Sequence, residues 1–64
     1  MNGVILKVFL TKGYGFVLGE DNQSRFFHVR DLTQKDQFNQ LHEGQKVTFT
    51  PTTTEKGPRA TEVA

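Results

Sequence analysis

The chain has 64 residues, among them eight lysines and arginines and seven aspartates and glutamates, which gives a net charge of +1. This length allows one small domain at most, and the absence of cysteine excludes a disulfide or a thiolate zinc site. No apolar run approaches the roughly 20 residues of a membrane span, and the small net charge is unlike that of a polycation that binds duplex phosphates.

Residues 3–10, Gly-Val-Ile-Leu-Lys-Val-Phe-Leu, predict the first strand because they are rich in β-branched and apolar side chains. Lys7 interrupts the apolar run, so one side of this strand is expected to meet water, and Phe9 follows two residues later. Residues 1–3 lead directly into this pattern without a basic, apolar leader, which predicts a soluble cytoplasmic protein.

The stretch Lys-Gly-Tyr-Gly-Phe-Val, residues 12–17, leads into a second predicted strand, 14–19. Side chains alternate between the two faces of a strand, so Tyr14 and Phe16 share one face. The glycines of this stretch have no Cβ, which leaves room for a flat ligand against the rings or for a tight bend of the backbone.

Residues 25–29, Arg-Phe-Phe-His-Val, predict a third strand, and the polar turn formers of residues 19–24 predict the hairpin that joins it to the second. Phe26 and His28 share one face of this strand, and Phe27 takes the other. In a hairpin register, the first two join the rings of the second strand in one aromatic patch.

Residues 33–40 are polar and show neither a strand nor a helix period, so they predict a long loop. Phe38 stands alone in this loop. Its residue type favours a ring that folds back onto the core, and a ring exposed for ligand binding is the alternative.

Residues 46–50 alternate strictly and predict a fourth strand, which Pro51 ends because proline cannot donate to a ladder. A loop over 52–58 and a last strand over 59–63 complete the chain. The result is five short strands, all β, without a helical period of useful length.

The aromatic patch is either a second core or a binding surface. The opposite phase already supplies a core, and no amphipathic helix is available to cover the patch. The candidate core positions are Val4 or Ile5, Leu6, Val17, Phe27, Leu32, Val47, Phe49, Ala60 or Thr61, and Val63. The pattern therefore favours a surface on which unpaired bases stack, because every base has a π-face.

Four stretches of the chain match motifs of one known family. Residues 12–17 are similar to the first ribonucleoprotein motif of the cold-shock domain family, and residues 26–28, Phe-Phe-His, resemble its second, usually Phe-Val-His. Residues 41–49 resemble the family's Leu-x-Glu-Gly-Gln-x-Val-x-Phe, and residues 56–60 its Lys-Gly-Pro-x-Ala. The motifs occur in the right order and cover nearly the whole chain. The resemblance implies a five-stranded antiparallel barrel of the oligonucleotide-binding (OB) type.

The resemblance also implies binding of single-stranded RNA or DNA with little sequence selectivity, in an RNA-chaperone or antiterminator role. It assigns Phe38 to the interface, because a loop aromatic there serves the family as a further base platform. Lysines and arginines around the rings are expected to meet phosphates. The predicted interface consists of Lys7, Phe9, Lys12, Tyr14, Phe16, Phe26, His28, Arg30, Phe38, Lys56 and Arg59.

The chain departs from the family pattern in its first and third strands. The family has Lys-Trp-Phe in the first strand. This chain has Lys7-Val8-Phe9 if one residue is missing from the following loop, a match that is preferred because it keeps both the lysine and the phenylalanine; in an ungapped match Lys7 replaces the tryptophan. The tryptophan is absent in either match. Val29 stands where the family often has an aromatic residue. Both changes predict weaker binding than that of a typical member. Arg25 stands where the family often has an inward valine, so the start of that strand is open.

Other functions follow less directly from the sequence. A protein-interaction barrel that kept the fold and lost most nucleic-acid binding is the alternative, favoured by the missing tryptophan and the small net charge. No nucleophile–base pair, phosphate loop or metal cluster supports an enzyme, and His28 and His42 have no cysteine to complete a metal site. We expect no cofactor, no metal, no membrane partner and a monomer; a place within a longer protein stays open.

Overall fold

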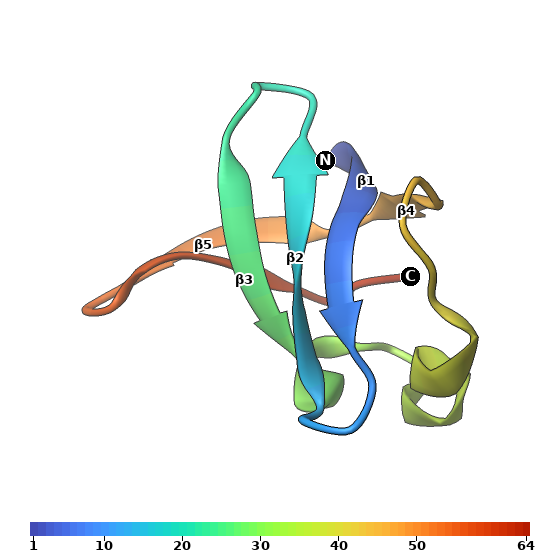
Figure 1. Cartoon of the computed structure of the whole chain (residues 1–64). Coiled ribbons are helices and arrows are strands. Elements are labelled where there is room, and N and C mark those ends of the chain that lie inside the picture. The colour runs from blue at the N-terminus through green and yellow to red at the C-terminus, as the bar shows by residue number, and fades with distance from the viewer.

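The computed structural model describes residues 1–64 as one curled, six-stranded sheet with two short 3-10 helices (Figure 1). Its elements are β1 (Asn2–Phe9), β2 (Tyr14–Gly19), β3 (Ser24–His28), η1 (Val29–Asp31), η2 (Lys35–Gln40), β4 (Lys46–Thr48), β5 (Thr50–Thr54) and β6 (Gly57–Thr61). The strand order is β4-β1-β2-β3-β6-β5. Because β4 and β5 are consecutive in the chain yet lie at opposite ends of this order, the sheet curls toward a closed barrel. The predicted all-β OB-type barrel is confirmed.

The predicted fourth strand is divided at Phe49, which raises the number of strands from five to six. The prediction that Pro51 ends a strand is wrong. Pro51 lies inside β5, where it pairs with Ala60 of β6. A proline is tolerated there because β5 is an edge strand, and its missing N–H need not serve a second neighbour.

The loop predicted over 52–58 is instead a hairpin of β5 and β6 that projects from the barrel (Figure 1). Its turn is held by Thr54, whose Oγ1 accepts from the Lys56 N–H at 3.3 Å and donates to the Gly57 carbonyl at 3.0 Å. Gly57 has φ +116°, a conformation that L side chains rarely adopt. The sheet is also not purely antiparallel, because β3 and β6 run parallel where they meet.

The segment predicted as a loop over 33–40 contains η2, and its single aromatic residue belongs to the core. Phe38 is 4% exposed and meets Phe27 edge to face, with ring centroids 6.4 Å apart. The prediction that Phe38 serves as an exposed base platform is therefore wrong for this structure, because the ring has no free face.

The core lies on the inward phase predicted for the strands. Its buried members are Ile5, Val17, Phe27, Leu32, Phe38, Leu41, Val47, Phe49, Ala60 and Val63. Leu6 was expected here but is 38% exposed. A β-bulge between Ile5 and Lys7 inserts one residue, so Ile5 points inward while Lys7 pairs with the outward Phe16.

Arg25 is the one charged residue among the buried side chains, at 7% exposure. Its guanidinium carbon lies 5.4 Å from the centroid of the Phe49 ring, and its two Nη atoms bond the carboxylate of Asp21. A paired guanidinium thus fills the position where the cold-shock family often has valine, and the strand starts one residue earlier, at Ser24. No helix in the structure is long and apolar enough to cross a membrane.

Candidate nucleic-acid interface

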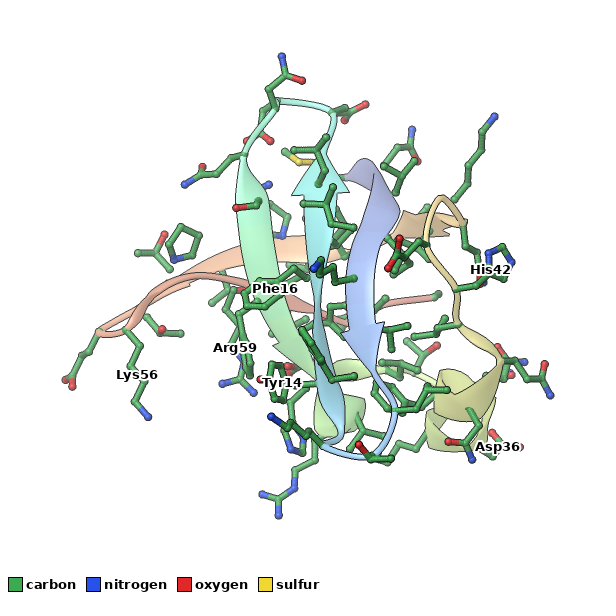
Figure 2. The ribbon with its side chains drawn as sticks, viewed as in Figure 1. Tyr14, Phe16, Asp36, His42, Lys56 and Arg59 are labelled. Carbon is green, nitrogen blue, oxygen red and sulfur yellow. The ribbon has the colours of Figure 1, made fainter.

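Two rows of outward side chains cross the strands side by side. The first row joins Lys7 of β1, Phe16 of β2, Phe26 of β3, Arg59 of β6 and Thr52 of β5 as successive Cα partners. The β2–β3 register is the one predicted from the alternation of the two strands, so the aromatic patch does form. Figure 2 shows Phe16 and Arg59 near each other over this part of the sheet.

The second row joins Phe9 of β1, Tyr14 of β2 and His28 of β3. The ring centroids of Phe9 and Tyr14 lie 5.0 Å apart, and those of Tyr14 and Phe26 lie 5.6 Å apart. Phe16 meets Tyr14 and Phe26 edge to face at 6.2 and 6.0 Å. The four phenyl and phenol rings are therefore one connected surface, in geometries that aromatic pairs favour.

Gly13 and Gly15, in and just before β2, serve the fold rather than leaving space on the aromatic face. Gly15 is buried and points inward: a Cβ there would lie 2.5 Å from the Lys7 carbonyl oxygen and 2.9 Å from Cζ of Phe27. Gly13, with φ +79°, forms the turn between β1 and β2. Of the two roles that the sequence allowed, room for a flat ligand and a tight bend, Gly13 provides the bend; Gly15 instead permits a close backbone approach that was not predicted.

His28 is oriented by the short helix η1 that follows it. Its Nδ1 accepts a hydrogen bond from the Arg30 N–H at 3.2 Å, so in the neutral ring the proton sits on Nε2. Its own backbone N–H donates to Oδ2 of Asp31 at 2.9 Å, which completes a capping box. The imidazole is thereby fixed at the end of the second row.

Asp31 also holds Arg59, a contact that sequence reasoning missed. Oδ2 of Asp31 accepts a hydrogen bond from Nε of Arg59 at 3.0 Å. The same oxygen forms an ion pair with Nη2 of Arg59, also at 3.0 Å. The guanidinium carbon lies 5.5 Å from the centroid of the Phe26 ring, within the range of a cation–π contact. Arg59 is 35% exposed and Asp31 only 10%, so the arginine faces solvent and the aspartate supports it from below.

An open groove of about 550 Å³ separates the aromatic rows from the β5–β6 hairpin. It is lined by Phe16, Phe26, His28, Arg30, Thr54, Lys56, Gly57, Pro58 and Arg59. The two ion pairs of the protein are Arg25–Asp21 and Arg59–Asp31, so the charges of Arg30 and Lys56 have no carboxylate partner. Aromatic rings and unpaired cations that line one groove suit a stacked base with its phosphate.

The structure brings most of the predicted interface residues together, and Phe38 is the exception. Lys12 lies in the turn that joins Phe9 to Tyr14, where its N–H donates to the Phe9 carbonyl at 3.0 Å. The strand alternation could not indicate Asp31 or Thr54, because neither side chain stands out in the sequence pattern. No three histidine or acidic side chains gather as a metal site would require.

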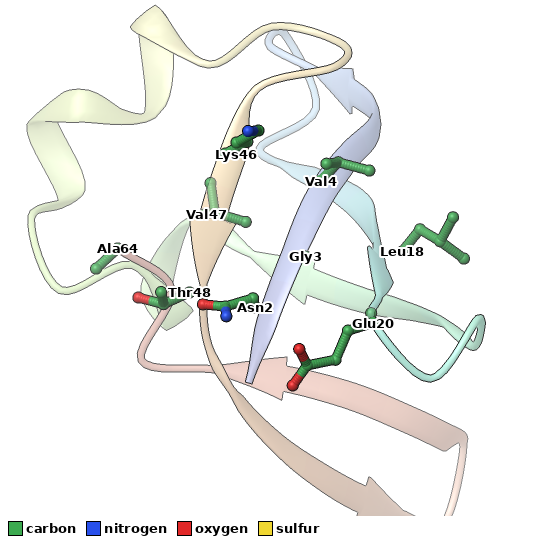
Figure 3. A pocket seen from close by; sticks show the side chains of 10 residues that line it. Asn2, Gly3, Val4, Leu18, Glu20, Lys46, Val47, Thr48 and Ala64 are labelled. Atoms are coloured by element: carbon green, nitrogen blue, oxygen red, sulfur yellow. The ribbon is translucent and has the colours of Figure 1, made fainter.

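A second groove, of about 530 Å³, lies where β1 and β4 begin and β2 ends (Figure 3). Its apolar lining residues are Val4, Leu18, Val47 and Ala64, and its charged ones are Glu20 and Lys46. It contains no aromatic side chain and its two charges have opposite sign. It therefore lacks both features of the aromatic groove.

Comparison with known proteins places the chain in a family. The model of the 'Cold-shock' DNA-binding domain matches residues 1–64. Cold shock protein 1 of Lactiplantibacillus plantarum is 44% identical over 62 residues, which cover 97% of this chain and 92% of the relative. The cold shock-like protein CspB of Bacillus cereus is 38% identical over 64 residues, covering 100% and 97%. The cold shock-like protein of Aquifex aeolicus is 47% identical over 53 residues, covering 81% and 74%. With its four sequence motifs, its barrel and its surface of outward rings, this chain belongs to the cold-shock domain family of nucleic-acid-binding proteins.

Proposed function

We propose that this protein binds single-stranded RNA or DNA, with low sequence selectivity, on its outward aromatic surface. The observation that carries the proposal is the connected set of Phe9, Tyr14, Phe16 and Phe26 rings, beside a groove with unpaired cations. A surface of this kind, with no apolar element covering it, is typical of a stacking platform.

Stacking supplies the affinity and selects the ligand. Each base that stacks on a ring contributes roughly 1–3 kcal/mol with little regard to its identity. Bases in a duplex are already stacked on one another and offer no free face, so single strands are preferred. The rings sit on neighbouring strands and contact one another, so little side-chain freedom is lost on binding.

Cations at the edges of the surface meet the phosphates. Lys7 ends the first row, Lys12 lies beside the second, and Arg30 and Lys56 face the groove, all without a carboxylate partner. Releasing counterions from the strand makes such contacts favourable and salt-dependent. Arg59 contributes less to this attraction, because Asp31 offsets its charge.

The role that follows is that of an RNA chaperone or antiterminator. A strand whose bases lie on the protein cannot pair with its complement, so binding would bias nucleic acid away from hairpins. This role requires no cofactor and no chemical step.

A titration tests the proposal. The protein has one tyrosine and no tryptophan, so intrinsic fluorescence reports on Tyr14, which is inside the surface. We expect single-stranded oligonucleotides to quench this signal and a duplex of the same sequence to compete poorly at moderate salt. Equal competition by the duplex would contradict the stacking mechanism. Absence of binding to either form would favour the protein-interaction barrel.

A further inference from the structure

The guanidinium of Arg59 is held as a directional donor rather than as a loose surface charge. One edge, Nε and Nη2, is directed at Oδ2 of Asp31, and the plane lies near the ring of Phe26. Asp31 is itself fixed by the His28 N–H at 2.9 Å. The other edge of the guanidinium, with Nη1 and the second N–H of Nη2, has no protein acceptor, and Arg59 is one of the residues that line the groove.

The free edge is better suited to a base than to a phosphate. Asp31 offsets the positive charge of Arg59, whereas Arg30 and Lys56 line the same groove with unpaired charges. A phosphate is therefore drawn more strongly to those two residues. Arg59 lies in one row with Phe16 and Phe26, so it stands beside the rings on which the proposed bases stack.

The two parallel N–H donors of a guanidinium edge, here called the fork, match one base in particular. Guanine presents two adjacent acceptors, O6 and N7, on its Hoogsteen edge, whereas adenine presents one acceptor and one donor there and thymine one acceptor. In a single strand this edge is exposed to the protein. We propose that Arg59, positioned by Asp31, reads guanine at one place along the bound strand and so adds a local preference to otherwise tolerant stacking.

This inference rests on the proposed binding of single strands, and one set of titrations tests both. A short oligothymidine is compared with strands in which one thymine, moved through each position, is replaced by guanine, adenine or 7-deazaguanine. We expect guanine at one position to bind about tenfold more tightly than thymine, as one bidentate contact allows. Adenine controls for the larger stacking area of a purine, and 7-deazaguanine lacks the N7 acceptor. Strands with either base at that position should therefore show little of the affinity that guanine adds over thymine.

Three variants separate the effect of the two parallel donors of Arg59 from the effect of positive charge on binding. Arg59→Lys keeps the charge but removes the fork, and Asp31→Asn loosens the guanidinium, so each should bring the guanine-to-adenine affinity ratio close to one. Lys56→Gln is the matched control: it should weaken binding of all strands alike and leave that ratio unchanged. Thermal melts of the variants verify that each is folded.

The outcomes of the two proposals differ. If the wild-type protein binds oligothymidine but shows no preference for guanine over adenine, or if Arg59→Lys keeps the preference, guanine reading by Arg59 is wrong and single-strand binding stands. If no single strand binds at all, the proposed function is wrong, and guanine reading falls with it.

Discussion

Arg25 donates to both carboxylate oxygens of Asp21, with Nη1 at 3.0 Å from Oδ1 and Nη2 at 2.6 Å from Oδ2. The hydrogen bond from Arg25 holds the pKa of Asp21 at about 2, below its ordinary value of 3.8. The pair ties the β2–β3 turn to the barrel end beneath it, where the guanidinium lies against Phe49.

This pair predicts a loss of stability in acid. A carboxyl whose pKa is lower in the folded than in the unfolded state stabilises the fold at higher pH. That stabilisation is complete above the unfolded pKa and is lost as the pH falls through the folded pKa, here between about pH 4 and pH 2. Thermal melts across this window should therefore show a falling midpoint, and Asp21→Asn should have a lower midpoint at pH 5 and a shallower fall.

The exposed Asp36 on η2 provides the control for this prediction (Figure 2). It has no ion pair, so Asp36→Asn should retain the acid dependence of the wild-type protein. An acid dependence of Asp21→Asn as steep as that of the wild type would mean that other carboxyl groups cause the loss.

The aromatic hairpin was predictable from sequence because its information is local. The period-two alternation of Tyr14 and Phe16 fixes which side chains share a face, and the polar turn fixes the pairing with β3. Leu6 was misplaced because the apolar run of β1 does not indicate which of Val4, Ile5 and Leu6 faces inward; Ile5 does, so Leu6 faces outward. The β-bulge after Ile5 then turns Lys7 outward as well, which alternation from Ile5 does not predict. Alternation therefore predicts a strand correctly only up to the first irregularity.

The contacts that complete the interface were not predictable because they join distant segments. Arg59 and Asp31 are 28 residues apart and meet only because β6 pairs with β3 in parallel.

The burial of Phe38 depends likewise on η2 folding against Phe27, which its polar neighbours do not indicate. Arg25 is buried because a carboxylate in the preceding turn pairs with it, an exception to the rule that charges stay outside.

Phe16→Ala and Phe27→Ala should separate binding from folding. Phe16 is 36% exposed on the outward face, so its truncation should cost about 1–3 kcal/mol of binding free energy and change the melting temperature little. Phe27 is fully buried, and truncating a core phenylalanine costs roughly 3–5 kcal/mol, enough to unfold a domain of this size. Melts and titrations of both variants test this; the reverse result would mean that the ligand binds elsewhere.

Phe26→Ala should resemble Phe16→Ala in weakening binding, with a small additional loss of stability. The ring of Phe26 contacts Tyr14 and lies beneath the guanidinium of Arg59, so its removal also disturbs their positions. The same melts and titrations measure the effect. Binding by Phe26→Ala as tight as that of the wild type would remove this ring from the proposed platform.

Phe38 provides a test of the corrected assignment. Phe38→Leu keeps most of the apolar volume in contact with Phe27 but removes the aromatic face, so it should fold and bind single strands as the wild type does. Phe38→Ala leaves a cavity and should lower the unfolding midpoint. A clear loss of affinity in a well-folded Phe38→Leu would mean that the ring leaves the core to stack on a base.

The salt dependence of binding measures how much of the affinity comes from charge. Lys7, Lys12, Arg30 and Lys56 are the unpaired cations of the interface, and each phosphate contact on a single strand changes the slope of log K against log salt by about −0.7. If about three contacts form, the slope should be near −2, and Lys56→Gln should make it shallower by about 0.7.

The control is Lys35→Gln, on η2 away from the rings, which should leave the slope unchanged. A slope steeper than about −5 would require more phosphate contacts than these cations can make, and stacking on the rings would then not be the main source of affinity.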